Sequence, residues 1–332
     1  MAKGRMRADA VRPLLALVGP TASGKTGASI PVAQAIRSEI VGLDSTNVYR
    51  GIDVGTAKPS PEERAQVLHH LLDLVEPGEN FSVARFQALA REAIAEIRGR
   101  GREPLLVGGS GLYYRAVVDG LRFPETAPRV RGYLEAESVA LGPEGLHRRL
   151  AGLDPVAAAR IQPANVRRTV RALEVVATTG RPFSSFAKAW NRYPPNAVVA
   201  AGIDVPRELL HRRIEARAAR IMPALMAETE MLLNRGHRGF IQSSQIIGYA
   251  EAVACLEEKV GSEEALQRTV RRTKALARRQ MAWFRRDPRI RWFDVGGEGD
   301  VSVVPELIGY FRDRLPVGLP ERVPGATMTV EA

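Results

Sequence analysis

The stretch Gly19-Pro20-Thr21-Ala22-Ser23-Gly24-Lys25-Thr26 matches G-x-x-x-x-G-K-[ST], the pattern of phosphate-binding loops. The apolar run Leu14–Val18 precedes it and predicts a buried strand, and residues 27–37 follow with helical spacing. A glycine-rich turn between a strand and a helix directs backbone N–H groups and the positive end of the helix at an anion. The sequence therefore predicts a polyphosphate site, in which Lys25 reaches the terminal phosphate and the Thr26 hydroxyl binds Mg²⁺.

Strands and helices alternate beyond this loop. Apolar runs predict further strands at Glu39–Leu43 and Pro104–Val107, and helical spacing predicts a helix at Val83–Arg98 with Ser82 as its N-cap. Alternation after a first-strand phosphate loop is typical of an α/β fold of the P-loop NTPase type, a parallel sheet flanked by helices.

The pattern changes between residues 122 and 196, which are helical and basic, so we expect a helical insertion domain there. The core is then 14–121 and 197–315, with a strand at Val198–Val205, helices over 207–283 broken at Met222-Pro223-Ala224, a strand at Ile290–Val295 and a helix at Val304–Arg314. Residues 1–13 read as a basic extension, and 316–332, rich in Pro and Gly, as a disordered tail.

The composition limits the class of protein. The single Cys255 rules out an intrachain disulfide framework, and no apolar stretch approaches a membrane span, so we expect a cytoplasmic protein without a membrane partner. Lys and Arg number 48 against 37 Asp and Glu, a net charge of +11, which favours a polyanionic partner.

Polar residues follow two of the predicted strands. Asp44 comes directly after Glu39–Leu43, and Ser110 follows Pro104–Val107 in a glycine-rich turn. Because the carboxyl ends of parallel strands meet at one edge of the sheet, we expect both to lie near Lys25. There Asp44 could hold Mg²⁺ through water, act as a general base, or only cap the following turn.

Several longer segments share a resemblance that no single one would support. They are GPTASGKT at 19–26, DSTNVYRGIDVGTAKP at 44–59, HHLLDLVEPGENFSVARF at 69–86, VGGSGLYYRA at 107–116, RALE at 171–174 and ARRQMAWFR at 277–285. Together they resemble the tRNA dimethylallyltransferase (tRNA isopentenyltransferase) family, over roughly residues 14–295.

The resemblance implies transfer of a dimethylallyl group from dimethylallyl diphosphate to N6 of the adenine at tRNA position 37, 3′ to the anticodon, in tRNAs that read U-starting codons. It implies a monomer without an obligate protein partner. By the same resemblance the glycine loop, with Mg²⁺, grips the diphosphate of the prenyl donor rather than a nucleotide. The implied catalytic residues are Lys25 and Arg217 on the diphosphate, Asp44 as general base, and Ser110, which stands where the family usually has Thr. Arg213, Arg217 and Arg220 have the spacing of one helix face.

The resemblance also implies contacts with the anticodon stem-loop of tRNA. The matching residues are Asp44, Ser45, Thr46, Asn47, Ser110, Arg131, Arg167, Arg168, Arg171, Gln245, Gly248, Tyr249, Arg278, Arg279, Gln280, Trp283 and Arg285. Residues 268–291 contain ten basic residues and one acid, which suits phosphate contacts. Trp283 and Phe284 are adjacent and diverge on a helix, so we expect one of them in the core. Asn47 and Asn165 stand where the family usually has Gln and Asp, and these departures bear on tRNA affinity.

Three other functions are compatible with parts of the sequence. A nucleotide or small-molecule kinase would use the same loop, with Asp44 on Mg²⁺, but gives no reason for the basic carboxyl-terminal third. A prenyltransferase acting on free AMP, ADP or ATP would not need a long basic insertion. A non-catalytic RNA-binding NTPase gives no reason for keeping Lys25, Thr26 and Asp44 together.

Overall fold

The computed structural model describes residues 12–195, 197–296 and 303–315. Most of the expected basic extension and the whole expected tail, 316–332, lie outside the described residues. Contacts divide the chain into unit 1, residues 1–118 and 195–332, and unit 2, residues 119–194, where the expected insertion spanned 122–196. Each unit is described by itself.

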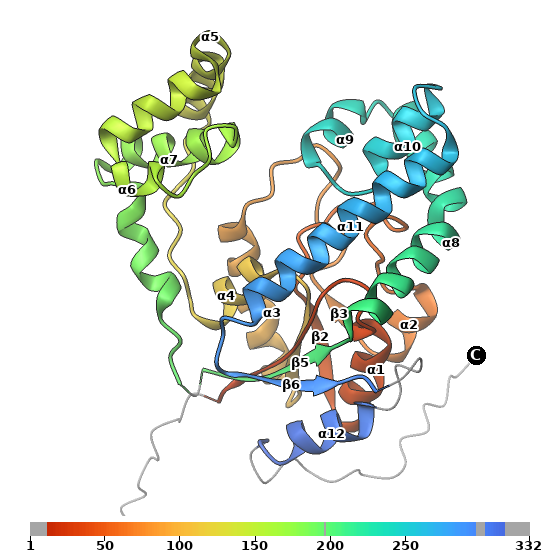
Figure 1. Ribbon diagram of the computed structural model, residues 1–332. Helices are drawn as coiled ribbons and strands as arrows, with labels where there is room; N and C mark the ends of the chain where they lie inside the picture. The colour runs from red at the N-terminus through yellow and green to blue at the C-terminus, as the bar shows by residue number, and fades with distance from the viewer. Residues whose placement is uncertain (1–11, 196, 297–302, 316–332) are drawn as a thin grey trace, which may run out of the picture. The chain divides into compact units, whose positions relative to one another are not determined.

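Unit 1 contains a six-stranded sheet in the order β3-β2-β4-β1-β5-β6 (Figure 1). Its strands are β1 (Leu14–Val18), β2 (Ser38–Gly42), β3 (His69–His70), β4 (Glu103–Gly108), β5 (Val198–Asp204) and β6 (Ile290–Asp294). All the pairings are parallel, which confirms the predicted α/β fold. β1 is central, so the loop that follows it opens at the middle of the carboxyl edge. The two-residue β3 was not predicted from the sequence.

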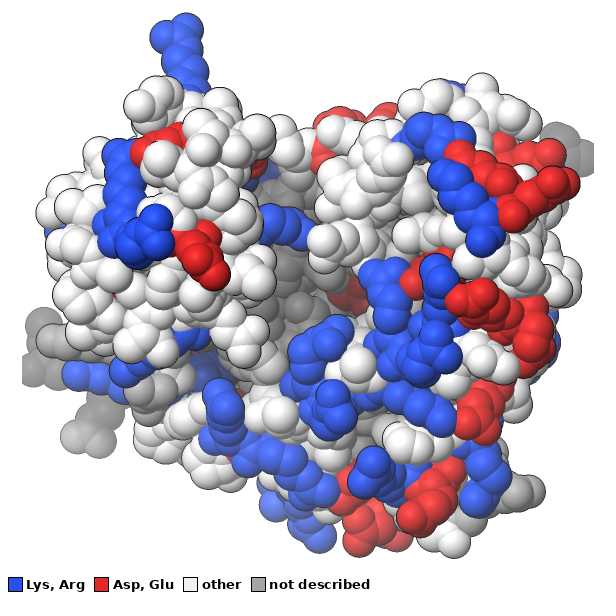
Figure 2. Space-filling view, turned by 45° about the horizontal axis from the view of Figure 1, so that its top comes forward, with Lys and Arg blue, Asp and Glu red and all other residues white. Residues whose placement is uncertain are grey.

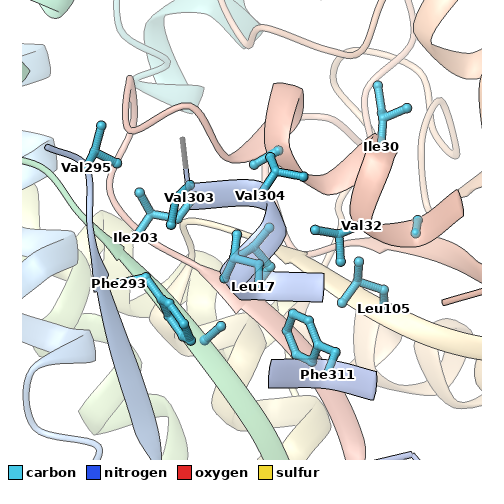
Figure 3. Packing of buried hydrophobic residues seen from close by; sticks show 14 of the residues in the cluster. Leu17, Ile30, Val32, Leu105, Ile203, Phe293, Val295, Val303, Val304 and Phe311 are labelled. Atoms are coloured by element: carbon cyan, nitrogen blue, oxygen red, sulfur yellow. The ribbon is translucent and has the colours of Figure 1, made fainter. Parts of the chain in front are cut away.

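Helices cover both faces of this sheet. α1 (Lys25–Ala35), α12 (Val304–Arg312) and the start of α8 (Arg207–Asn234) pack on the face that carries Leu15 and Leu17. α3 (Val83–Gly99) and α4 (Gly111–Val118) pack on the face that carries Ala16 and Val18. Figure 3 shows the hydrophobic cluster on the face with Leu15 and Leu17, to which Leu17, Val32 and Phe311 belong. Alternate residues of β1 thus enter two cores, which is why the strand is apolar throughout.

The other helices of unit 1 are α2 (Pro61–Gln66), α9 (Arg238–Ser244), α10 (Tyr249–Leu256) and α11 (Ser262–Phe284). The expected break at Met222-Pro223-Ala224 is wrong, because α8 continues through Pro223. A proline removes a single helical hydrogen bond. Met222 and Leu225, on either side of it, are buried in a cluster with Ile52 and Tyr249 that holds the helix together. Among the described residues, no helix has the length and apolar character needed to cross a membrane.

Unit 2 consists of α5 (Pro128–Leu153), α6 (Pro155–Ala158), α7 (Val166–Thr179) and the 3₁₀ helix η1 (Phe183–Asn191). It has a hydrophobic core of its own, to which α5 contributes Leu146 and Leu150 and α7 contributes Leu173. α5 bends at Gly142, whose φ of 69° precedes a proline. Unit 2 is therefore helical, as its sequence predicts.

Candidate active site

The glycine loop joins β1 to α1. Gly24 (φ 90°) is the N-cap of α1, and Ala22 also has a left-handed backbone, with φ 62°. The Pro20 carbonyl accepts hydrogen bonds from Ser23 N–H at 3.3 Å and from Lys25 Nζ at 2.6 Å. Lys25 Nζ is also 3.5 Å from Ser23 Oγ. The lysine ammonium group therefore lies against its own loop, where anion oxygens would compete for it.

Asp44 lies just beyond β2 with a fixed carboxylate. Its Oδ1 accepts two hydrogen bonds from Thr46, one from the backbone N–H at 2.8 Å and one from the hydroxyl at 2.6 Å. Within the described residues, Oδ2 has no hydrogen-bond partner. The arrangement holds the carboxylate in one orientation and leaves one oxygen able to accept a proton.

The ends of β2 and β4 are tied together. Leu43 donates its N–H to the Val107 carbonyl at 2.7 Å, and the Ser110 N–H donates to the Leu43 carbonyl at 3.3 Å. The Ser110 hydroxyl accepts the Tyr113 N–H at 3.5 Å, at the start of α4. The structure therefore places Ser110 and Asp44 at the same edge of the sheet, as the sequence predicts.

Lys25, Asp44 and Arg217 influence one another electrostatically. Burial lowers the pKa of Lys25 to about 8; the Asp44 carboxylate opposes this shift, and the Arg217 guanidinium adds to it. Burial and the neighbouring Arg220 lower the pKa of Arg217, and Asp44 again opposes the shift. The three groups come from α1, the segment after β2, and α8. Two cations and one carboxylate thus gather around the glycine loop.

A magnesium ion would find few ligands from the protein here. The described residues contain no group of three or more His, Cys, Asp or Glu side chains that could hold a metal. Mg²⁺ in such sites takes its remaining ligands from substrate phosphates and water. The Thr26 hydroxyl, at the start of α1, fits that arrangement, because a diphosphate in the loop would supply the other oxygens.

The end of α11 packs on this edge of the sheet. Gln280 Oε1 accepts the Thr21 N–H of the glycine loop at 2.8 Å. A Cβ at Gly111 would lie 3.0 Å from atoms of Trp283, so α11 lies directly against the start of α4. Trp283 is 40% exposed and Phe284 is 1% exposed, which confirms that one of the two is in the core.

Comparisons with known proteins identify the family of this chain. A sequence model of the IPP transferase family matches residues 47–287, and one of isopentenyl transferases matches residues 13–73. The tRNA dimethylallyltransferase of Kineococcus radiotolerans is 49% identical over 287 residues, 84% of this chain and 90% of its own length. This chain belongs to the tRNA dimethylallyltransferase family.

Other members support the assignment. The Streptomyces coelicolor tRNA dimethylallyltransferase is 46% identical over 89% of this chain and 94% of its own. Among solved structures, the tRNA isopentenylpyrophosphate transferase of Bacillus halodurans is 38% identical, with a TM-score of 0.63 over 91% of this chain and 98% of its own. A eukaryotic dimethylallyltransferase acting on tRNA, 22% identical, shares the fold with a TM-score of 0.72 over 92% of this chain and 80% of its own.

Several arginines matched to the family's tRNA contacts are exposed. Arg167 and Arg168 are exposed on α7, and Arg278 and Arg279 are exposed on α11. Figure 2 shows Lys and Arg side chains gathered on one face of unit 1. These four guanidinium groups could reach phosphates without breaking the packing of the unit that carries them.

Other arginines have partners within the protein. Arg131 and Arg171 each donate to the fully buried Glu174 at 2.7 Å, inside unit 2. Arg285 pairs with Asp204, and its guanidinium lies 4.1 Å from the ring centre of Trp292. These ion pairs hold the protein's own structure, so an RNA phosphate would have to share each guanidinium.

The expected tRNA contact of Tyr249 needs correction. The residue is only 1% exposed. Its hydroxyl donates a hydrogen bond to Glu228, and the same hydroxyl oxygen accepts one from the Gly55 N–H at 3.2 Å. Gly248 is also buried, whereas Gln245 and Ser45 are exposed and Asn47 is partly buried. Glu228 itself accepts the N–H groups of Asp53 and Val54. Tyr249 therefore anchors the 53–55 loop instead of facing a substrate.

Sequence reasoning missed Tyr113. Burial raises the pKa of its phenol, with added effects from Tyr49 and Asp44, so this side chain lies near the carboxylate. Its ring centre is 4.2 Å from that of Phe86. One helical turn separates Tyr113 from Ser110, and that spacing was a signal in the sequence that could have found it.

Proposed function

We propose that the protein transfers the dimethylallyl group of dimethylallyl diphosphate to N6 of adenine 37 in tRNAs reading U-starting codons. Family membership makes the chain a tRNA dimethylallyltransferase that prenylates a tRNA adenine. The observation that carries the proposal is the gathering of Lys25, Arg217 and Asp44 around the glycine loop. We propose further that a single chain suffices and that it acts in the cytoplasm.

The glycine loop is suited to the diphosphate leaving group. Backbone N–H groups at the start of α1, the Lys25 ammonium and the Arg217 guanidinium would stabilise the negative charge that develops as diphosphate departs. Thr26 would hold Mg²⁺, which supplies further charge neutralisation when bound.

Asp44 is suited to the acceptor. As the bond between adenine N6 and the first carbon of the dimethylallyl group forms, the bond from that carbon to diphosphate oxygen breaks and its electron pair leaves on diphosphate. The N6 proton passes to Oδ2 of Asp44, the oxygen that Thr46 does not use. Ser110, at the same edge, would orient the bound base.

The direct test is incubation of the purified protein with dimethylallyl diphosphate, Mg²⁺ and unmodified tRNA, followed by mass spectrometry of the nucleosides. We expect N6-dimethylallyladenosine at position 37 of tRNAs that read U-starting codons, and none when position 37 is changed to G. Modification at another adenosine, or none at all, would contradict the proposal.

A kinase is the second candidate because it would use the same loop. The two candidates differ in the ligand that stabilises the protein. We expect dimethylallyl diphosphate with Mg²⁺ and tRNA to raise the melting temperature more than ATP with Mg²⁺ and tRNA at equal concentration. The reverse order would favour the kinase.

A further inference from the structure

Gln280 joins α11 to the glycine loop. It lies 259 residues from Thr21 in the sequence, yet its Oε1 accepts the Thr21 N–H at 2.8 Å. The neighbouring Arg278 and Arg279 are exposed, whereas Gln280 is partly buried. The family resemblance groups these residues as tRNA contacts, but the structure turns Gln280 towards the loop.

The hydrogen bond fixes the peptide group that also holds Lys25. The Thr21 N–H and the Pro20 carbonyl belong to one planar peptide unit, so orienting one orients the other. That carbonyl accepts the Lys25 ammonium group at 2.6 Å and the Ser23 N–H at 3.3 Å. A chain of contacts therefore runs from Gln280 through one peptide plane to the ammonium group of Lys25.

The loop needs such support because its backbone is strained. Ala22, next to Thr21, has φ 62°, a left-handed conformation that is unfavourable for a non-glycine residue. Such a conformation persists only where the surroundings over-determine it. The Gln280 hydrogen bond is one of those constraints.

The β4–α4 turn leaves space for the amide. A Cβ at Gly109 would lie 2.5 Å from Gln280 Nε2 and 3.3 Å from its Cδ. Gly109 is not among the residues with positive φ, so alanine suits its backbone. The contact with Gln280 opposes alanine most strongly, and a milder contact lies at 3.3 Å from the Gly19 carbonyl oxygen. Gly109→Ala is therefore a way to displace Gln280 without changing it.

We propose that Gln280 is a positioning residue for Lys25, acting on the prenyl donor through the Pro20–Thr21 peptide and not on tRNA by contact. This inference rests on the proposed function, because it takes the glycine loop as the donor site. It predicts that loss of Gln280 weakens the use of dimethylallyl diphosphate and leaves tRNA affinity unchanged.

The test compares Gln280→Met, which keeps length but has no acceptor oxygen, with Gln280→Ala and Gly109→Ala. KM for dimethylallyl diphosphate is measured at saturating tRNA, and Kd for tRNA is measured without donor. We expect each variant to raise the donor KM about fivefold, the effect of one neutral hydrogen bond, with the tRNA Kd within twofold. Arg279→Ala should show the opposite pattern.

A double variant makes the test sharper. Gly109→Ala should add much less in the Gln280→Ala background than on its own, because only the 3.3 Å contact with the Gly19 carbonyl oxygen remains. Multiplying effects, or a raised tRNA Kd with an unchanged donor KM, would overturn the inference. Lys25→Met serves as the reference. If it leaves the donor KM unchanged, the donor-loop assignment of the proposed function fails, whatever the Gln280 variants show.

Discussion

At the scale of single residues, we propose that Asp44 takes up the proton and that Lys25 binds the anion. Asp44 is held by two hydrogen bonds from Thr46 to one carboxylate oxygen. Asp44→Asn keeps an acceptor for Thr46 but removes the oxygen that takes the proton. We expect kcat to fall by a factor of about 100 or more, typical of a lost general base. The tRNA Kd should stay within twofold.

Single-turnover assays with saturating tRNA and donor would measure the loss, and filter binding would provide the control. Turnover close to that of the unaltered enzyme would remove Asp44 as the base. A large loss of tRNA affinity would instead show that Asp44 acts mainly in binding.

The lowered pKa of Lys25 predicts a pH dependence. In the proposed donor site the ammonium form binds diphosphate. Its population falls as pH rises through a pKa of about 8, whereas an ordinary lysine would stay charged to about pH 10. We therefore expect kcat/KM for dimethylallyl diphosphate to be level below about pH 7, to bend near pH 8 and to fall up to tenfold per pH unit above it.

Lys25→Met is the matched variant, because it keeps the length of the side chain without the charge. Its kcat/KM should be low and should lack the fall above pH 8. If the alkaline fall persists in Lys25→Met, another group titrates there.

At the scale of elements, we propose that α11 contributes both to tRNA binding and to the donor site. Arg278 and Arg279 are exposed, whereas Arg268, near the start of the same helix, pairs with Glu264 at 2.6 Å. We expect Arg278→Gln to weaken tRNA binding and to reduce the slope of log K against log salt by about 0.7–0.9, one phosphate contact. Arg268→Gln, with the same change of charge, should leave the slope unaltered. Equal slopes for both variants would argue against this surface.

A second feature at this scale is the attachment of the 53–55 loop to α8 and α10 by hydrogen bonds. The Tyr249 hydroxyl joins Glu228 on α8 to the Gly55 N–H. Tyr249→Phe leaves both with an unmet hydrogen bond in a buried place, at a cost of about 1–3 kcal/mol. At roughly 2–4 °C per kcal/mol for a domain of this size, the melting temperature should fall by several degrees. Tyr133→Phe, at a side chain 67% exposed, should change it little. Equal melting temperatures for the two variants would show that the anchor is weak.

At the scale of the whole molecule, local patterns sufficed for the framework. The apolar run Leu14–Val18 predicted both ends of β1. A strand that is buried on both faces is apolar throughout, so the ends of the apolar run mark the ends of the strand. Ser82 caps α3 by accepting the Arg85 N–H at 3.1 Å, as the sequence predicts. The placement of Asp44 and Ser110 followed from the parallel sheet alone.

The features that the sequence did not predict depend on packing between residues far apart in the chain. Pro223 lies within a continuous helix because buried neighbours outweigh one lost hydrogen bond. β3 has two residues and exists only because β2 lies beside it. The Gln280–Thr21 contact and the burial of Tyr249 depend on how helices far apart in the sequence pack together. The identities of the residues alone do not predict that packing.

We propose that the glycine loop holds a prenyl diphosphate beside a carboxylate that faces a tRNA adenine. A crystal structure of the Asp44→Asn variant with an anticodon stem-loop, Mg²⁺ and dimethylallyl diphosphate tests it most directly. We predict diphosphate in the 19–26 loop with Lys25 on its oxygens, and adenine N6 within hydrogen-bond distance of residue 44. Diphosphate bound outside that loop, or an adenine remote from residue 44, would contradict the claim.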